Sequence, residues 1–250
     1  GNDSIFARDG NNTIFADGGD DTITIGNGDN TIFGGDGDDN IIVEDGDNII
    51  FGQAGNDTIT VGHGNNTINA SPGEDTIIIN GDGINEIITG VKDDIIMLLG
   101  HGDNKTKSGS GDDTIFIKGD GDNIIFLGDD DDTIYITGNG NNTIDGGSGD
   151  DVFYTIYGNN TIDGGSGDDT IWAMYGNNTI DGDSGDDTIW AMYGNNTIDG
   201  GSGDDTIYAM YGNNKIFISD DENSFTYIYV SSDNSDNIIY NHDGDVIHSN

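Results

Sequence analysis

Hydrophobic and polar positions recur along this chain with a period close to nine residues. One Ile marks each repeat, and it occupies 22 of the 24 repeats before residue 220, the exceptions being Thr106 and Phe153. Thr usually precedes the Ile, so inward and outward positions alternate around it, as expected of a short β-strand rich in β-branched residues. Gly-rich polar segments separate these strands and predict turns. A helical interpretation fails, because the pattern has no 3.6-residue period and glycine is too frequent.

Asp and Asn alternate at the position two residues before each Ile, beginning with Asp3, Asn12, Asp21 and Asn30. Because the alternation is regular, one coil of the predicted solenoid contains two repeats. The coil is 18 residues long near both ends of the array and 19 in the middle. We expect an all-β parallel β-roll of about twelve coils with two short strands each. The repeats predict an array over residues 1–220, followed by a divergent last coil or C-terminal cap over 221–250.

The composition of the chain adds one conclusion to this picture: it limits the kinds of partner that the protein can bind. The chain has 250 residues, 43 of them Gly, and a formal net charge of -42. Nucleic acid and anionic membranes both require a basic surface, so the charge excludes them and favours cations. No apolar run approaches the ~20 residues that span a bilayer, so we expect no membrane insertion. The chain has no Cys and therefore no disulfide framework.

Residues 164–172 read Gly-Gly-Ser-Gly-Asp-Asp-Thr-Ile-Trp, which matches the nonapeptide G-G-x-G-x-D-x-U-x. The chain therefore resembles the repeats-in-toxin (RTX, hemolysin-type) family. That resemblance implies a secreted β-roll in which Asp carboxylates and turn carbonyls bind several Ca²⁺ ions between adjacent coils. Carboxylate and carbonyl oxygens are the ligands that Ca²⁺ prefers. Carried over to this sequence, the candidate metal residues are Asp21, Gly34, Asp36, Asp39, Asp57, Asp75, Asp94, Asp113, Asp132, Gly146, Ser148, Asp151, Gly164, Ser166, Asp169, Gly182, Ser184, Asp187, Gly200, Ser202 and Asp205.

The Asn repeats depart from that family pattern, since RTX rolls carry the Asp motif on both edges. Here the second edge has Asn without paired glycines, as in Tyr175-Gly176-Asn177-Asn178. A side-chain amide both donates and accepts hydrogen bonds, so stacked Asn side chains predict a metal-free ladder. The alternative is that Asn is present only because it tolerates turn conformations.

Aromatic residues form three further rows, the first two of them at the outward position after the core Ile. One row contains Phe116, Tyr135, Tyr154, Trp172, Trp190 and Tyr208, a second contains Phe15, Phe33 and Phe51, and a third contains Tyr157, Tyr175, Tyr193 and Tyr211. Exposed aromatic rows are typical of an interface, which here means self-association or a glycan platform. The alternative is that the rings only pack against one another.

No nucleophile is paired with a base, and no phosphate loop or catalytic metal cluster is evident, so we do not expect an enzyme. The leading hypothesis is a secreted, calcium-binding structural or adhesive β-roll, as a subunit or segment of a filament, located outside the cell or on its surface. One alternative is a calcium-dependent RTX module of a larger secreted toxin, protease or adhesin. Another is a glycan-binding module that uses the aromatic rows.

Overall fold

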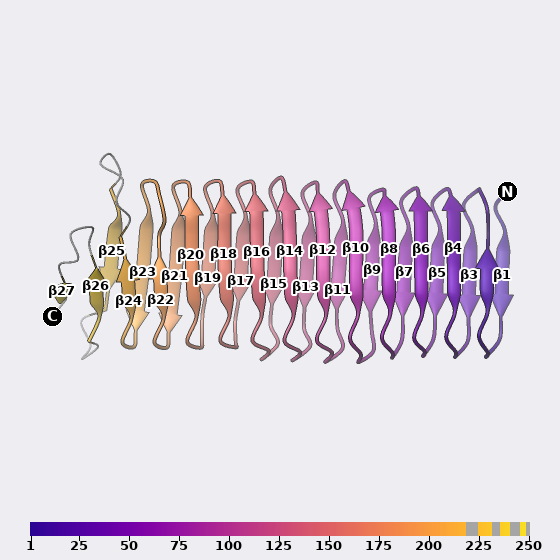
Figure 1. The fold of residues 1–250 in the computed structure, drawn as a ribbon, viewed down its shortest axis with the longest axis horizontal. Helices are drawn as coiled ribbons and strands as arrows, with labels where there is room; N and C mark the ends of the chain where they lie inside the picture. Colours follow the sequence, from indigo (N-terminus) through magenta and orange to yellow (C-terminus); the bar gives the residue numbers. More distant parts are fainter. Residues whose placement is uncertain (219–224, 232–235, 241–245, 249–250) are drawn as a thin grey trace. The chain divides into compact units, whose positions relative to one another are not determined.

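The computed structural model describes residues 1–218, 225–231, 236–240 and 246–248. The protein is an all-β parallel β-solenoid of about twelve coils with two strands per coil, as predicted (Figure 1). The chain divides into two compact units, Gly1–Leu127 and Gly128–Asn250. Within the described residues, no helix has the length and apolarity needed to cross a membrane.

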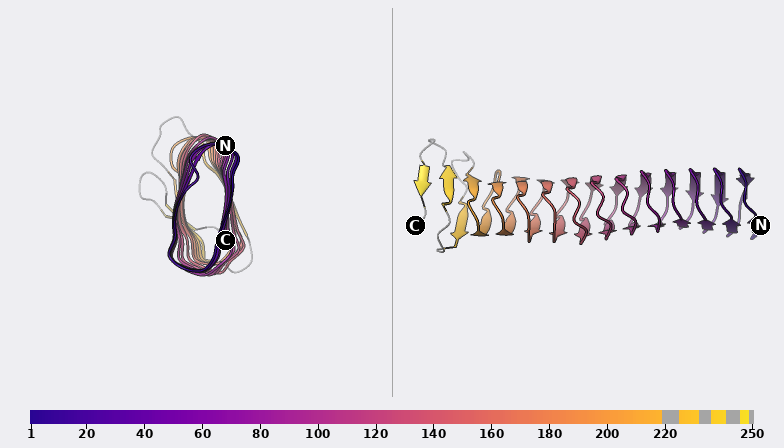
Figure 2. Two further views of the ribbon diagram at one scale, coloured as in Figure 1. Left: turned by 90° about the vertical axis from the view of Figure 1, so that its right-hand side faces the viewer. Right: turned by 90° about the horizontal axis from the view of Figure 1, so that it is seen from below.

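In the first unit, odd-numbered and even-numbered strands form two separate parallel sheets (Figures 1 and 2). The odd-numbered sheet contains β1 (Ser4–Ala7), β3 (Thr22–Ile25), β5 (Asn40–Val43), β7 (Thr58–Val61), β9 (Thr76–Ile79), β11 (Ile95–Leu98) and β13 (Thr114–Ile117). The even-numbered sheet contains β2 (Thr13–Phe15), β4 (Thr31–Asp36), β6 (Ile49–Ala54), β8 (Thr67–Pro72), β10 (Glu86–Val91) and β12 (Lys105–Ser110). Strand β14 (Ile124–Asp129) crosses the boundary between the units.

The second unit repeats this arrangement. Its odd-numbered strands are β15 (Thr133–Ile136), β17 (Val152–Thr155), β19 (Thr170–Ala173), β21 (Thr188–Tyr193), β23 (Thr206–Tyr211) and β25 (Tyr227–Val230). Its even-numbered strands are β16 (Thr143–Ser148), β18 (Thr161–Ser166), β20 (Thr179–Ser184), β22 (Thr197–Asp199), β24 (Lys215–Phe217), β26 (Ile238–Tyr240) and β27 (Val246–His248).

The core of each unit is a stack of Ile side chains, because the register places equivalent residues of successive coils side by side. Ile23 pairs with Ile41 in the first unit, and Ile171 pairs with Ile189 in the second. All four side chains are fully buried. The Ile column of each strand, joined on the odd-numbered strands by a second buried apolar position such as Ile25 and Ala173, thus supplies a continuous core from a chain that is only 32% hydrophobic. The 19-residue coils keep this register, since Ile77 pairs with Ile96.

The last strands show how the array ends. β25 pairs with β23 and β26 pairs with β24, both in parallel, whereas β27 pairs with β26 in the antiparallel direction. Parallel pairing therefore continues beyond residue 220. Parts of the predicted cap lie outside the described residues, namely 219–224, 232–235, 241–245 and 249–250. The division at residue 220 stays a prediction.

Candidate metal centre

The Asp column lies in the turns that join each even-numbered strand to the following odd-numbered strand, which we call the Asp edge. From Asp21 to Asp205 these Asp residues are buried, at 2% exposure or less. Along the column, the backbone N–H of one Asp donates to Oδ1 of the next, as in nine pairs between Asp21 and Asp205. Asp151 donates to Asp169, and Asp169 donates to Asp187, both at 2.8 Å. One oxygen of each carboxylate is thus used by the fold itself.

The second carboxylate oxygen, Oδ2, is buried as well but has no hydrogen-bond partner in the protein. This holds for nine members of the column, namely Asp21, Asp39, Asp57, Asp75, Asp94, Asp151, Asp169, Asp187 and Asp205. A buried carboxylate oxygen without a partner is costly, by roughly 1–3 kcal/mol or more for a charged group. Such an oxygen therefore needs either a proton or a cation.

Burial raises the pKa of these carboxyl groups in the metal-free protein. Desolvation is the largest cause; the amide N–H of the preceding Asp lowers the pKa, and neighbouring carboxylates raise it again. The pKa of Asp169 rises to about 7 and that of Asp187 to about 8. The Asp39 pKa is also raised, in the first unit. At neutral pH, part of the column therefore retains its protons unless a cation replaces them.

A glycine faces Oδ2 in the turns that match the repeat best. A Cβ placed on Gly164 would overlap Oδ2 of Asp169, and one on Gly182 would overlap Oδ2 of Asp187. The same holds at Gly34, Gly52, Gly146 and Gly200. We call these six turns the glycine turns: residues 34–39, 52–57, 146–151, 164–169, 182–187 and 200–205. Because Gly has no side chain, the space beside the unpartnered Oδ2 is bordered by backbone. A cation in that space could be bound by the carboxylate and by backbone carbonyls together.

A side chain fills the same position in the other Asp turns, which we call the filled turns. The residues there are Ala16, Ala70, Thr89, Ser108 and Leu127, all buried. The Thr89 hydroxyl donates to the carbonyl of Ser108, and the Ser108 hydroxyl donates to that of Leu127, both at 2.9 Å. Side-chain atoms and hydroxyl hydrogen bonds thus occupy the space that is open in the glycine turns.

Lys92 occupies the fourth position of the G-G-x-G-x-D motif in one filled turn, where the motif has its third Gly, and adopts a φ of 91°. Its side chain is exposed.

The opposite edge contains the Asn column, in the turns that lead from odd-numbered to even-numbered strands. Nδ2 of Asn178 donates to Oδ1 of Asn196 at 3.2 Å and to the carbonyl of Gly176 at 3.4 Å. The backbone N–H of Asn178 donates to the same Oδ1 at 2.9 Å. This pattern recurs in both units, for example from Asn48 to Asn66. The predicted Asn ladder is confirmed, and its amides are satisfied where Asp would leave an oxygen without a partner.

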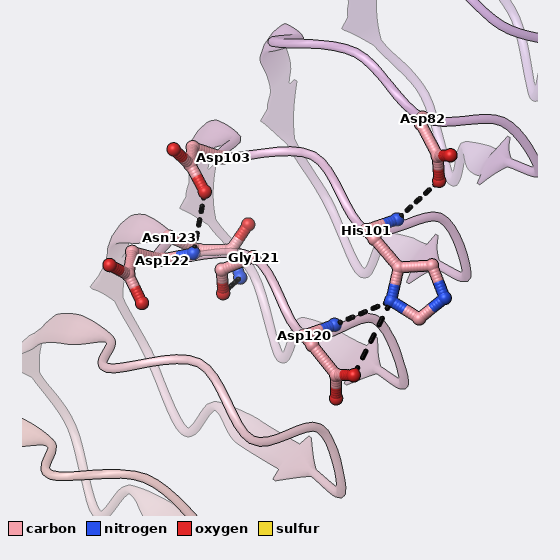
Figure 3. Close-up of polar contacts among 7 residues, drawn as sticks. All are labelled: Asp82, His101, Asp103, Asp120, Gly121, Asp122 and Asn123. Atoms are coloured by element: carbon pink, nitrogen blue, oxygen red, sulfur yellow. Dashed lines mark hydrogen bonds and ion pairs between the residues drawn. The ribbon is translucent and has the colours of Figure 1, made fainter.

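Sequence reasoning missed a second kind of ladder on the outside of the turns. In Figure 3 the backbone N–H of His101 donates to Asp82 Oδ1 at 2.7 Å, and the N–H of Asp120 donates to His101 Nδ1 at 3.1 Å. Because Nδ1 accepts that bond, it does not also pair as a cation with the Asp120 carboxylate 3.6 Å away. Beside it, the N–H of Asp122 donates to Asp103 Oδ1 at 2.7 Å. His101 thus serves as a ladder acceptor, and its spacing from His63 and Asp82 was the available signal.

The remaining predicted residues lie around the Asp turns without pointing at Oδ2. Asp36, Ser166 and Ser202 are exposed, and Ser148 and Ser184 are half-buried. The Ser148 hydroxyl donates to Asp129 Oδ1 at 2.8 Å, so it bonds to the neighbouring coil. Asp113 and Asp132 are buried in the column like the other Asp residues.

Calcium fits this edge by the chemistry of its donors. The described residues contain no cluster of three or more His, Cys, Asp or Glu side chains arranged around one point. The column instead offers one buried carboxylate per coil, together with backbone carbonyls, and a hard cation with six to eight oxygen ligands suits that mixture. Softer metals that require His or Cys ligands do not.

Fold and edge together define a parallel β-roll built from nonapeptide turns. A model of the RTX calcium-binding nonapeptide repeat (4 copies) matches residues 1–32, 24–59, 43–77, 136–155, 154–189 and 190–221. These matches cover more than half of the chain, which therefore belongs to the RTX calcium-binding repeat family. The unmatched stretch from 78 to 135 contains the filled turns that begin at Thr89, Ser108 and Leu127.

A solved structure with the same fold is described as the X-ray crystal structure of a hyperactive, Ca²⁺-dependent, β-helical antifreeze protein from an Antarctic bacterium. It covers 100% of this chain and 95% of its own, with a TM-score of 0.53 and 19% sequence identity. At that identity the likeness shows the fold alone. A search of curated proteins finds no match.

Proposed function

We propose that the chain is a calcium-dependent structural β-roll that becomes ordered outside the cell when Ca²⁺ fills its Asp edge. The observation that supports this most directly is the row of buried Oδ2 atoms without partners, opposite an Asn edge that is fully hydrogen-bonded. Calcium at about the millimolar extracellular level would neutralise that row. Inside the cell, where calcium is scarce, the same row would oppose folding.

The glycine turns are the proposed calcium sites, and the filled turns are proposed to remain without calcium. In the glycine turns, residues such as Asp169 and Asp187 would hold the ion together with turn carbonyls. In the filled turns, the buried side chains of Ala16, Ala70, Thr89, Ser108 and Leu127 would instead take up the space beside the carboxylate that an ion needs. The Asn edge is proposed to bind no metal.

A structural or adhesive role is proposed because the β-roll presents a regular, repeating surface. Among the described residues we identify no catalytic group on that surface. The alternative, a secretion and binding module of a larger RTX toxin, protease or adhesin, places the activity elsewhere and uses the same calcium chemistry. The antifreeze activity of the solved neighbour is not carried over. A flat ice-binding surface would need two parallel rows of outward Thr. On the even-numbered sheet of the second unit, the outward residues next to the exposed Thr161 and Thr179 are Asp163 and Asp181, so this sheet has only one Thr row.

Calcium titration tests the proposal. The chain is dialysed into chelator, and circular dichroism is followed as Ca²⁺ is added, while the number of bound ions is measured by calorimetry and elemental analysis. We expect a poorly ordered chain that becomes β-rich, with ions bound only in glycine turns. Unchanged circular dichroism between chelator and calcium would refute calcium-dependent folding.

Two variants locate the ions. Asp169→Asn alters a glycine turn and should reduce the number of bound ions, whereas Asp94→Asn alters a filled turn and should leave it unchanged. Equal losses in both variants would contradict the division into two kinds of turn, although calcium-dependent folding itself would stand.

A further inference from the structure

Two rows of stacked aromatic rings run along the second unit. The strand row contains Tyr135, Tyr154, Trp172, Trp190, Tyr208 and Tyr229. The turn row contains Tyr157, Tyr175, Tyr193 and Tyr211, at the points where the odd-numbered strands enter the Asn turns. We call the two rows together the aromatic surface.

The rings of the aromatic surface stack face to face. Trp172 and Trp190 have ring centroids 4.0 Å apart and an interplanar angle of 12°, and Tyr193 and Tyr211 are 4.9 Å apart at 7°. Each interior ring therefore covers the faces of its neighbours, and ring edges and hydroxyl groups remain exposed. A sugar platform works through open ring faces, so this stacking disfavours glycan as the occupant.

The aromatic surface is also the uncharged part of the second unit. Residues 133–142, 152–160, 170–178, 188–196 and 206–214 contain no charged side chain and no His. The acidic groups lie in the intervening Asp segments, such as 163–169 and 181–187. A chain with a net charge of -42 repels its own copies over most of its surface. Two copies therefore approach one another most easily through this surface.

The first unit does not share this segregation of charge. Its Asn turns contain acidic residues, among them Glu44, Asp82, Asp103, Asp120 and Asp122. The Asp residues at 82, 103, 120 and 122 are those of the ladders in Figure 3. The contrast confines an uncharged aromatic edge to the second unit.

The spacing between successive rings of the aromatic surface indicates which kind of partner fits it. Rings recur once per coil, at the spacing of neighbouring β-strands, ~4.8 Å. A partner that contacts every ring edge must carry the same repeat, as in the interdigitated interfaces of stacked β-sheets. We propose that the aromatic surface of the second unit is the interface with a second copy of this chain, in which ring edges of the two copies interdigitate.

This inference rests on the proposed structural role, and the two can fail separately. Sedimentation velocity of the calcium-loaded chain over a range of concentrations measures association, and circular dichroism reports folding independently. We expect a concentration-dependent dimer or larger assembly that strengthens as salt is raised, because salt screens the repulsion between acidic copies. A chain that folds with calcium yet stays monomeric at every concentration and salt would overturn the interface alone.

The variant that tests the surface is Tyr175→Glu with Tyr193→Glu, because both side chains are exposed and the substitutions add charge to the turn row. The matched control is Thr161→Glu with Thr179→Glu, which adds two charges to exposed positions of β18 and β20 in the other sheet. We expect the aromatic variant to weaken association about tenfold or more, as for central aromatic residues of an interface. The control should associate like the unaltered chain.

If the Glu variant does not fold, Tyr175→Ser with Tyr193→Ser removes the same rings without adding charge, and the same loss of association is expected. Association that survives loss of the turn rings, or that falls equally in the Thr control, contradicts the proposal. So does a calcium-loaded monomer that binds a polysaccharide through Trp172 and Trp190.

Discussion

Asp187→Asn should stabilise the metal-free protein and weaken the calcium-loaded one. Oδ2 of Asp187 is buried without a partner, and Oδ1 accepts the N–H of Asp169 at 2.8 Å. An amide at this position keeps the Oδ1 acceptor and removes the charge. Its Nδ2 would lie beside Oδ1 of Asp205, which already accepts the Asp187 N–H at 3.1 Å. The substitution therefore converts one rung of the Asp column into a rung of the Asn type.

The magnitude follows from the pKa of Asp187, which burial raises from 3.8 to about 8. Below about pH 4 the carboxyl is protonated in both the folded and the unfolded chain, so it does not affect stability. As pH rises from about 4 to about 8, only the unfolded chain loses the proton, so the folded state loses stability. At pH 7 this amounts to about 4 kcal/mol at most, at ~1.4 kcal/mol per pKa unit, and solvent screening lowers it. Burial of the replacing amide reduces the expected gain to roughly 2 kcal/mol.

Circular dichroism measures the effect: the ordered fraction of the unaltered chain and of the variant is compared in chelator at each pH, and their urea stability is compared in saturating calcium. In chelator the variant should be more stable at pH 7 and indistinguishable near pH 4. In calcium the order should reverse, because the variant lacks one carboxylate ligand. This reversal separates a cation site from a carboxylate that is merely buried.

Asn178→Asp is the matched control in the opposite column. It removes the Nδ2 hydrogen bonds to Asn196 and Gly176 and adds a buried charge. It should destabilise the protein in chelator and in calcium alike. If Asp187→Asn destabilises the protein in chelator at pH 7, the Oδ2 atom has a partner that the proposed site does not include, and the reasoning fails.

Gly164→Ala should raise the calcium concentration needed for folding, because the new Cβ overlaps Oδ2 of Asp169; an unchanged titration midpoint would show that this glycine does not border the ion. Thr106→Val should stabilise the protein by about 1–2 kcal/mol in thermal or urea unfolding, since the Thr106 hydroxyl is buried without a partner and Val restores an apolar core position. In chelator, the stability of the unaltered chain should fall from about pH 4 to about pH 8, and saturating calcium should flatten that dependence. The stacked Trp172–Trp190 pair should give an exciton couplet in near-ultraviolet circular dichroism that appears with calcium and is absent from Trp172→Phe.

The outer ladders show what sequence reasoning could have found but did not. His63 and His101 look scattered when they are considered as metal ligands. At coil spacing they occupy the same column as Asp45, Asp82 and Asp120, and each offers an acceptor to the next coil. The shared property is hydrogen-bond acceptance, which a search by residue type does not reveal.

The fold could be predicted from the sequence by itself, because the repeat length and the alternation within it set the number of strands in each coil. A single Ile per repeat and the alternation of Asp21, Asn30 and Asp39 are sufficient for a two-strand coil with one edge of each kind. The Asn ladder also followed from chemistry alone, since an amide satisfies itself in a stack. These properties are local to one coil and are multiplied by repetition.

Only the tertiary structure showed that the residue five positions before each Asp lies beside its Oδ2, and which parts of the aromatic rings are exposed. In sequence, Asp75 and Asp169 occupy the same column. In the fold, the methyl group of Ala70 occupies the position that Gly164 leaves open beside the Asp169 carboxylate. Likewise, Trp172 and Trp190 could have presented their faces or their edges, and their stacking settles that they present edges. Both outcomes depend on contacts between residues about one coil apart or on the path of a turn, and a period specifies neither.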